Sequence, residues 1–136
     1  MTEPVGQEAP GAGMEKGPGG KKVRGLRGAV DVEENTAPAI IAATEQLLRE
    51  IVIRNDLERG DIISAIFTVT PDLDAAFPAE AARRLGWLDV ALMCAREIPV
   101  PGSQPGIVRV LIHAYSDHQP VHVYLGRASQ LRPDLQ

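Results

Sequence analysis

Only one segment of this chain carries apolar residues at helical spacing over several turns. Between Thr36 and Asn55, positions three and four apart form a single stripe made of Ile40, Thr44, Leu47, Leu48, Ile51 and Val52. Thr36 can cap this helix, and Pro38 is tolerated in its first turn. A chain of 136 residues with one long helix must build the rest of its core from strands.

The remaining apolar residues lie in runs with strand character. The sequence predicts a short helix over 78–85, capped by Gly86, and strands over 23–32, 62–69, 90–97, 107–115 and 121–129. The fold class is therefore α/β (α+β), with a mixed five-stranded sheet, one long helix and one short helix. Because one long helix covers one face of a sheet, the uncovered face suggests that several copies assemble.

The first 22 residues differ in composition from the rest of the chain. Residues 1–20 hold six of the 13 glycines and three of the 11 prolines, and Val5 is their only branched aliphatic residue. Such a segment buries too little apolar surface to offset the entropy of ordering it. We predict a disordered Gly/Pro-rich tail over 1–22 and one folded domain over 23–136.

Charge and composition exclude several classes of protein. The net charge is −4, whereas nucleic-acid binding depends on clustered positive charge. The single cysteine cannot form an intramolecular disulfide, and the first residues lack the pattern of a secretory signal. No apolar run approaches the roughly 20 residues that span a bilayer. We expect a cytoplasmic protein that binds neither nucleic acid nor membranes.

A permanent cation lies inside an apolar strand. Arg109 interrupts the run at 107–112, and a cation shielded from water needs a carboxylate or another anion as its partner. Two interpretations stay open at this point. Arg109 forms either a structural ion pair, with Glu97 as its partner, or part of an anion-binding site.

The other unusual residues give weaker indications. Arg24 and Arg27 should face opposite sides of their strand, and Gly25 and Gly28 would allow a ligand or backbone to approach closely. This glycine spacing is a weak signal, and solvated arginines are the favoured interpretation. Cys94 alone is typical of a small buried apolar residue. The three histidines show no metal-ligand spacing, and neither a nucleophile elbow nor a dinucleotide fingerprint is present.

Seven segments follow one another from residue 23 to the end of the chain. They are VRGLRGA at 23–29, TPDLDAAFPA at 70–79 with Ala81 and Arg83 beyond it, GW at 86–87, CARE at 94–97, IVRV at 107–110, HVYL at 122–125 and LRPDL at 131–135. Together, in this order, they resemble the small monofunctional AroH-type chorismate mutases, which form the trimeric α/β class.

The resemblance implies an isomerase that converts chorismate to prephenate, a step toward phenylalanine and tyrosine. This intramolecular Claisen rearrangement needs no cofactor and no metal. It also implies a homotrimer that forms a pseudo-α/β-barrel with active sites between subunits. A protein that only binds small carboxylates as a trimer, or one that resembles the imine deaminases, is the alternative.

The resemblance also implies roles for individual residues. Arg109 would stabilise the ether oxygen, Arg27 would bind a carboxylate and Glu97 would accept a hydrogen bond from the ring hydroxyl. Tyr124 would contact the carboxylate end, and Cys94 would lie beside the ring hydroxyl. The remaining substrate-binding residues divide between an apolar wall and the mouth of the site: Phe77, Ala79, Leu92 and Met93 in the wall, Arg83, Leu131 and Arg132 at the mouth.

The spacing of two of these residues gives a geometric expectation. Cys94 and Glu97 are three apart on a predicted strand, so their side chains should point to opposite faces of the sheet. Within one subunit they could not easily share a site. The resemblance resolves this by placing Cys94, Phe77 and Arg83 on one chain and Arg27, Glu97, Arg109 and Tyr124 on its neighbour.

Overall fold

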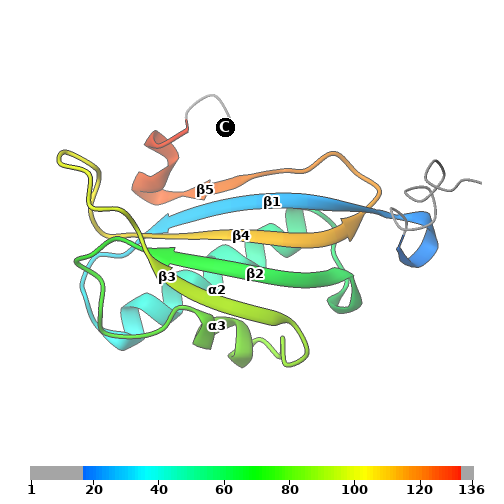
Figure 1. The fold of residues 1–136 in the computed structure, drawn as a ribbon, viewed down its shortest axis with the longest axis horizontal. Helices are drawn as coiled ribbons and strands as arrows, with labels where there is room; N and C mark the ends of the chain where they lie inside the picture. Colours follow the sequence, from blue (N-terminus) through cyan, green and yellow to red (C-terminus); the bar gives the residue numbers. More distant parts are fainter. Residues whose placement is uncertain (1–16, 133–136) are drawn as a thin grey trace, which may run out of the picture.

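Five strands form one mixed sheet (Figure 1). The computed structural model describes residues 17–132, and residues 1–16 and 133–136 are not described. The strands lie side by side in the order β3-β2-β4-β1-β5. The central strand β4 is antiparallel to both of its neighbours, while β3 and β5 pair in parallel with β2 and β1. The strands are β1 (Lys22–Asp31), β2 (Ile62–Val69), β3 (Ala91–Arg96), β4 (Ile107–Ser116) and β5 (Val123–Leu125).

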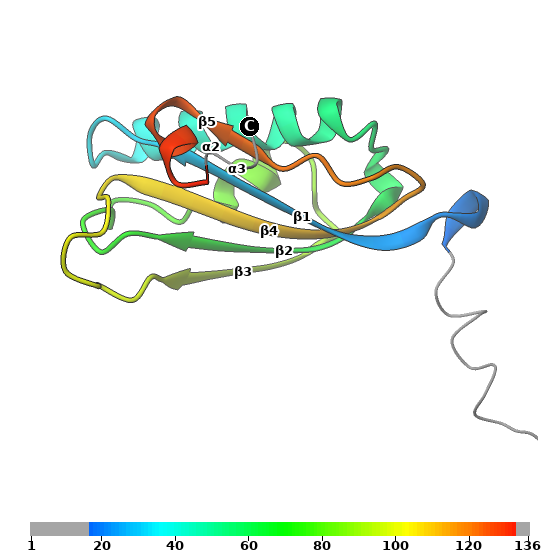
Figure 2. The ribbon, with the colours of Figure 1, turned by 90° about the horizontal axis from the view of Figure 1, so that it is seen from above.

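Two α-helices lie on the same face of this sheet (Figure 2). They are the long α2 (Ala37–Arg54) and the short α3 (Ala79–Arg84). The Thr36 hydroxyl accepts a hydrogen bond from the Ala39 amide at 3.2 Å, so the predicted N-terminal cap is present. The predicted fold class, a mixed five-stranded sheet with one long and one short helix, is therefore confirmed.

The apolar stripe of α2 forms the core with the inward-facing residues of the strands. Leu47, Leu48 and Ile51 are fully buried, and so are Leu26 of β1 and Phe67 of β2. The side of the sheet away from α2 and α3 is called the open face here. Among residues 17–132 neither α-helix covers it, and Ile66 and Met93 lie exposed on it. The sequence predicted that its one long helix would leave one face of the sheet uncovered, and the open face is that face.

The last strand is shorter than predicted. The sequence indicated a strand over 121–129, but β5 ends at Leu125 and a 3-10 helix, η3 (Gly126–Gln130), follows. Gly126 turns the chain with a φ of 59°, a conformation that favours glycine. Asp31 fixes the turn, because its carboxylate accepts hydrogen bonds from the backbone amide and from Nε of Arg127 at 3.1 and 3.0 Å.

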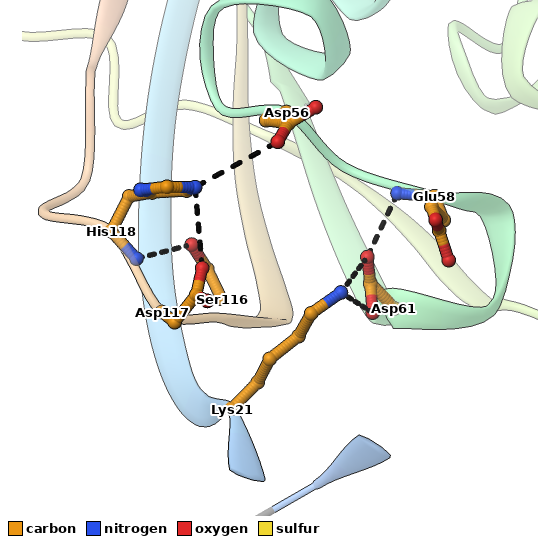
Figure 3. A network of polar contacts seen from close by, with 7 residues as sticks. All are labelled: Lys21, Asp56, Glu58, Asp61, Ser116, Asp117 and His118. Atoms are coloured by element: carbon orange, nitrogen blue, oxygen red, sulfur yellow. Dashed lines mark hydrogen bonds and ion pairs between the residues drawn. The ribbon is translucent and has the colours of Figure 1, made fainter. Parts of the chain in front are cut away.

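The described residues include a short helix that precedes the predicted boundary at residue 22. The predicted tail lies outside the described residues as far as residue 16, but a 3-10 helix, η1 (Pro18–Gly20), precedes β1. The ammonium group of Lys21 binds both carboxylate oxygens of Asp61 at 3.0 and 3.1 Å (Figure 3). Asp61 is 2% exposed, and it also accepts a hydrogen bond from the Glu58 amide. The bond to Asp61 raises the pKa of Lys21, so this link persists at neutral pH.

No helix among residues 17–132 is long and apolar enough to cross a membrane. The remaining 3-10 helix, η2 (Arg59–Asp61), connects α2 to β2.

Candidate active site

Strand pairing brings two arginines to neighbouring positions on the open face. In β4 the alternate residues Val108 and Val110 point into the core, so Arg109 between them points away from the helices. Arg27 of β1 lies opposite Leu111 of β4, on the same face as Arg109. The predicted separation of Arg24 and Arg27 onto opposite faces follows from the same alternation.

Arg109 is held by the carboxylate of Glu97, the residue that follows β3, on the far side of β2. Its Nε donates to Oε2 of Glu97 at 2.8 Å, and the Thr68 hydroxyl donates to the same oxygen at 2.7 Å. Glu97 is in turn fixed by its backbone amide, which donates to the Val69 carbonyl. The ion pair predicted as one interpretation of Arg109 is therefore present. It engages only Nε, which leaves the terminal nitrogens of Arg109 available to an anion.

The backbone of Arg27 is fixed by a histidine. His122 accepts a hydrogen bond from the Arg27 amide at its Nδ1, with a distance of 3.0 Å. Burial, together with the charges of Arg27 and Arg132, lowers the pKa of His122 below its ordinary value of 6.5. The imidazole is therefore neutral at neutral pH, with its proton on Nε2.

These side chains surround a pocket of about 330 Å³, which is called the open-face pocket here. Tyr124 lines it from β5, where strand pairing places it beside Ala29, and Arg132 lines it from the end of the described chain. Leu131 packs against the small apolar cluster around Tyr124. Three arginines against one glutamate give this region an excess of positive charge, which suits an anion with more than one carboxylate. The lining residues are Arg27, Gly28, Ile66, Thr68, Arg109, Val110, Leu111, Tyr124 and Arg132.

A second pocket, of about 720 Å³, lies beside the edge strand β3 on its helix-facing side. This edge pocket is lined by Phe77, by Cys94 and by the segment between β2 and α3. Asn35 holds that segment, because its side-chain oxygen accepts hydrogen bonds from the amides of Asp74 and Ala75 at 3.0 and 3.1 Å. Phe77 is 71% exposed, so its ring is free to contact a molecule in the pocket.

The carboxylate of Asp72 ties the same segment to the start of β4. Asp72 accepts a hydrogen bond from the Gly106 amide at 3.2 Å. Burial alone would raise the pKa of Asp72, but hydrogen bonds from Thr70 and from the backbone outweigh it, so the pKa is lowered. The carboxylate is charged at neutral pH and fixes the loop that carries the edge pocket.

Cys94 and Glu97 point to opposite faces, as their spacing predicts. Cys94 pairs with Phe67 and packs against the core on the helix side, whereas Glu97 bonds to Arg109 on the open face. The edge pocket and the open-face pocket have no lining residue in common. One chain therefore carries two separate pockets.

The structure places the predicted site residues in three groups. Arg27, Glu97, Arg109, Tyr124 and Arg132 gather at the open-face pocket, with Leu131 beside them, and Phe77 and Cys94 line the edge pocket. The other four predicted residues line neither pocket. Ala79 is buried in α3, Leu92 packs against the core, Arg83 is exposed on α3 and Met93 is exposed on the open face: their roles stay predictions.

Two residues of the open-face pocket region were missed by the sequence interpretation. Thr68 bonds to Glu97, and His122 bonds to the amide of Arg27. The alternation of β2 would place Thr68 on the same face as Ile66, but only the register with β4 puts it opposite Arg109. For His122, only its position two residues before Tyr124 connected it with the site in the sequence.

Among residues 17–132, no group of three or more His, Cys, Asp or Glu side chains is arranged to hold a metal ion. The two pockets offer cationic and hydrogen-bonding groups together with apolar side chains. Such groups bind, orient and electrostatically stabilise an anion.

Comparisons with known proteins agree on one family. The family model described as chorismate mutase type I matches residues 23–135. "Chorismate mutase AroH" of Thermus thermophilus is 50% identical over 118 residues, which cover 84% of this chain and 97% of that protein. "Chorismate mutase AroH" of Bacillus subtilis (strain 168) is 40% identical over 117 residues, which cover 83% and 92%.

A solved structure gives the same result. The structure described as "Chorismate mutase from Clostridium thermocellum Cth-682" superposes with a TM-score of 0.77 at 52% sequence identity. The match covers 79% of this chain and 98% of that chain. By its sequence and its fold, this chain belongs to the chorismate mutase type I family.

Proposed function

We propose that the chain rearranges chorismate to prephenate at a site in which the open-face pocket of one subunit meets the edge pocket of another. The observation that carries this proposal is the arginine cluster of the open-face pocket, in which Glu97 orients Arg109 and His122 orients the backbone of Arg27. The family membership supports the activity, and prephenate leads to phenylalanine and tyrosine. The alternative, a protein that only binds carboxylates or an imine-deaminase-like protein, is not favoured.

The reaction moves electrons only within the substrate. The ether C–O bond breaks while a C–C bond forms between the enolpyruvyl side chain and the ring, so no group on the protein is modified. The protein contributes by holding the compact conformer in which the two reacting carbons are close. It also contributes positive charge near the ether oxygen, where negative charge develops as the bond breaks.

Each residue of the open-face pocket has a role in this scheme. Arg109 donates its terminal N–H groups to the ether oxygen, because Glu97 holds Nε and thereby aims the guanidinium. Arg27 and Tyr124 bind a carboxylate of the dianionic substrate. Glu97 accepts a hydrogen bond from the ring hydroxyl through Oε1, because Thr68 and Arg109 both engage Oε2.

The edge pocket completes the site from a neighbouring chain. Phe77 supplies an apolar wall, and Cys94 lies beside the ring hydroxyl. Because the two pockets are on different faces of one chain, the contact between copies is heterologous, and such contacts form a ring when the rotation between neighbours closes. We propose that three copies form the ring, that the barrel-like interior covers the exposed Ile66 and Met93, and that the enzyme works in the cytoplasm.

The activity is tested by following the ultraviolet absorbance of chorismate after addition of the pure protein, with no metal or nucleotide. We expect the absorbance to fall and prephenate to accumulate in equal amount. A rate no higher than the spontaneous rearrangement would contradict the proposed activity. The absence of prephenate among the products would contradict it as well.

A further inference from the structure

Among residues 17–132, one charged side chain that lines the edge pocket forms neither a hydrogen bond nor an ion pair. Three charged residues line it: Asp74, Glu80 and Arg96. Asp74 accepts a hydrogen bond from the side-chain amide of Asn35 at 2.7 Å. Glu80 forms an ion pair with Arg84, one turn along α3, at 2.9 Å. Both carboxylates of the pocket therefore have partners.

Arg96 is the exception. It is the last residue of β3, opposite Val69 of β2, and it follows Cys94 by two positions on the helix-facing side of the strand. Its side chain lines the edge pocket, and among residues 17–132 it has no hydrogen bond or ion pair. A guanidinium stays charged at every physiological pH. The charged side chain without a partner in the edge pocket is thus a cation, two residues along β3 from Cys94.

We propose that Arg96 binds the second carboxylate of the substrate from the edge pocket, an assignment that rests on the proposed function. The substrate carries two carboxylates, and Arg27 and Tyr124 of the open-face pocket account for one of them. When a neighbouring chain closes over the open-face pocket, Arg96 enters the site beside Cys94 and Phe77. It is a substrate-binding residue, and it acts on the ground state and the transition state alike, because the carboxylate keeps its charge throughout the reaction.

This assignment predicts a specific kinetic pattern. Replacement of Arg96 by glutamine should raise KM for chorismate by roughly five- to fiftyfold, the range for loss of a hydrogen bond between charged groups in a partly exposed site. The value of kcat should stay within about twofold of wild type, since uniform binding does not change the barrier from the bound state. The fall of kcat/KM with added salt should be less steep in the variant, because one screened attraction is lost.

A substitution at Glu80 can restore the positive charge that R96Q removes from the edge pocket. Glu80 lines the same pocket from α3, so E80K places a cation there from another element. In the R96Q background, E80K should bring KM back toward the wild-type value. R96K should also retain part of the affinity, because it keeps the charge and loses only the forked geometry.

The experiment compares wild type, R96Q, R96K and the R96Q/E80K double variant, with R54Q as the matched control. Arg54 pairs with Glu50 on α2 and lines neither pocket, so R54Q removes the same charge elsewhere. Inactive wild-type protein would contradict the proposed function itself. Active wild type with an unchanged KM in R96Q, with an equal rise in R54Q, or with no recovery from E80K, would overturn the assignment of Arg96 alone.

Discussion

Arg109 meets a structural need and a chemical need with different atoms of one side chain. Nε is fixed by Glu97, which satisfies the requirement that a cation within a sheet have an anionic partner. The same side chain lines the open-face pocket, and Glu97 does not engage its terminal nitrogens. The two interpretations that the sequence left open are therefore compatible, because a guanidinium has donors in more than one direction.

The catalytic role of Arg109 predicts a large effect on turnover. Arg109→Ala should cost at least about 3 kcal/mol of transition-state stabilisation, or more than roughly a hundredfold in kcat. Steady-state kinetics on chorismate measure it, and Arg49→Ala on the exposed face of α2 is the control. An effect confined to KM, with kcat intact, would contradict the role at the ether oxygen.

His122 predicts a pH dependence of stability. Its pKa in the folded protein lies below the unfolded value, so the unfolded chain binds more protons as the pH falls and folding is destabilised. The contribution of His122 is complete above pH 6.5 and is lost as the pH falls through the lowered pKa. His122→Asn keeps an acceptor near the Arg27 amide but does not titrate.

The free energy of unfolding, measured with urea at one protein concentration between about pH 7.5 and 5, should therefore fall more steeply for wild type than for His122→Asn. His113 and His118 are present in both proteins and cancel in the comparison. Equal slopes would show that the imidazole does not titrate differently in the folded and unfolded states.

The face on which a side chain lies follows from strand alternation and could be predicted. The contacts that a side chain makes across strands depend on the register and could not be predicted. Alternation alone separates Arg24 from Arg27 and Cys94 from Glu97. The bond between Thr68 and Glu97 requires the pairing of β2 with β3, and their approach to Arg109 requires the pairing of β2 with β4, which no local pattern encodes. The roles of Glu97 and Tyr124 came from the family resemblance rather than from physical reasoning on the residues.

At the scale of elements, the predicted order of helices and strands is correct and the end of the last strand is wrong. The run from Val121 to Ser129 has the composition of a strand, but Gly126 turns the chain and Arg127 donates hydrogen bonds to Asp31. These two residues are 96 apart in the sequence, so the sequence around either one cannot reveal the contact. The resulting η3 turn brings Leu131 and Arg132 back to the open-face pocket region.

The packing of α2 on β1 predicts an effect of a single methyl group. A Cβ at Gly28 would lie 2.7 Å from Cδ1 of Ile51 and 3.2 Å from the backbone oxygen of Val123. Gly28→Ala should therefore lower the free energy of unfolding by about 1–3 kcal/mol, because the helix or β5 must shift. Gly60→Ala is the control, since nothing lies within 4 Å of its Cβ. Urea denaturation of both variants measures the difference, and equal stabilities would contradict close packing at Gly28.

For the whole molecule, the main consequence of the fold is that the two pockets of one chain are separated, and the proposed function treats them as halves of a site shared between chains. The open-face pocket and the edge pocket lie on different faces of the sheet. This separation explains why a protein of 14.6 kDa with a well-formed core still has an exposed sheet face. In the proposed trimer, each site therefore takes its open-face pocket from one chain and its edge pocket from a neighbouring chain.

Complementation between two inactive variants tests that statement. Arg109→Ala damages only the open-face pocket, and Phe77→Asp damages only the edge pocket, so each trimer alone should be inactive. When the two proteins are unfolded and refolded together, some sites combine an intact open-face pocket from one chain with an intact edge pocket from the other. Random mixing at equal amounts should restore about a quarter of the wild-type activity, because each site draws one half from each of two chains.

Sites built within single chains would give a different result. Every chain in the mixture carries one damaged pocket, so the mixture would then be as inactive as its parents at any ratio. Refolding the two variants separately and mixing them afterwards, under conditions where trimers do not exchange subunits, is the control and should give no recovery. Light scattering on the refolded mixture checks that trimers have formed. Recovered activity that follows the product of the two mole fractions would then assign the two half-sites to different subunits.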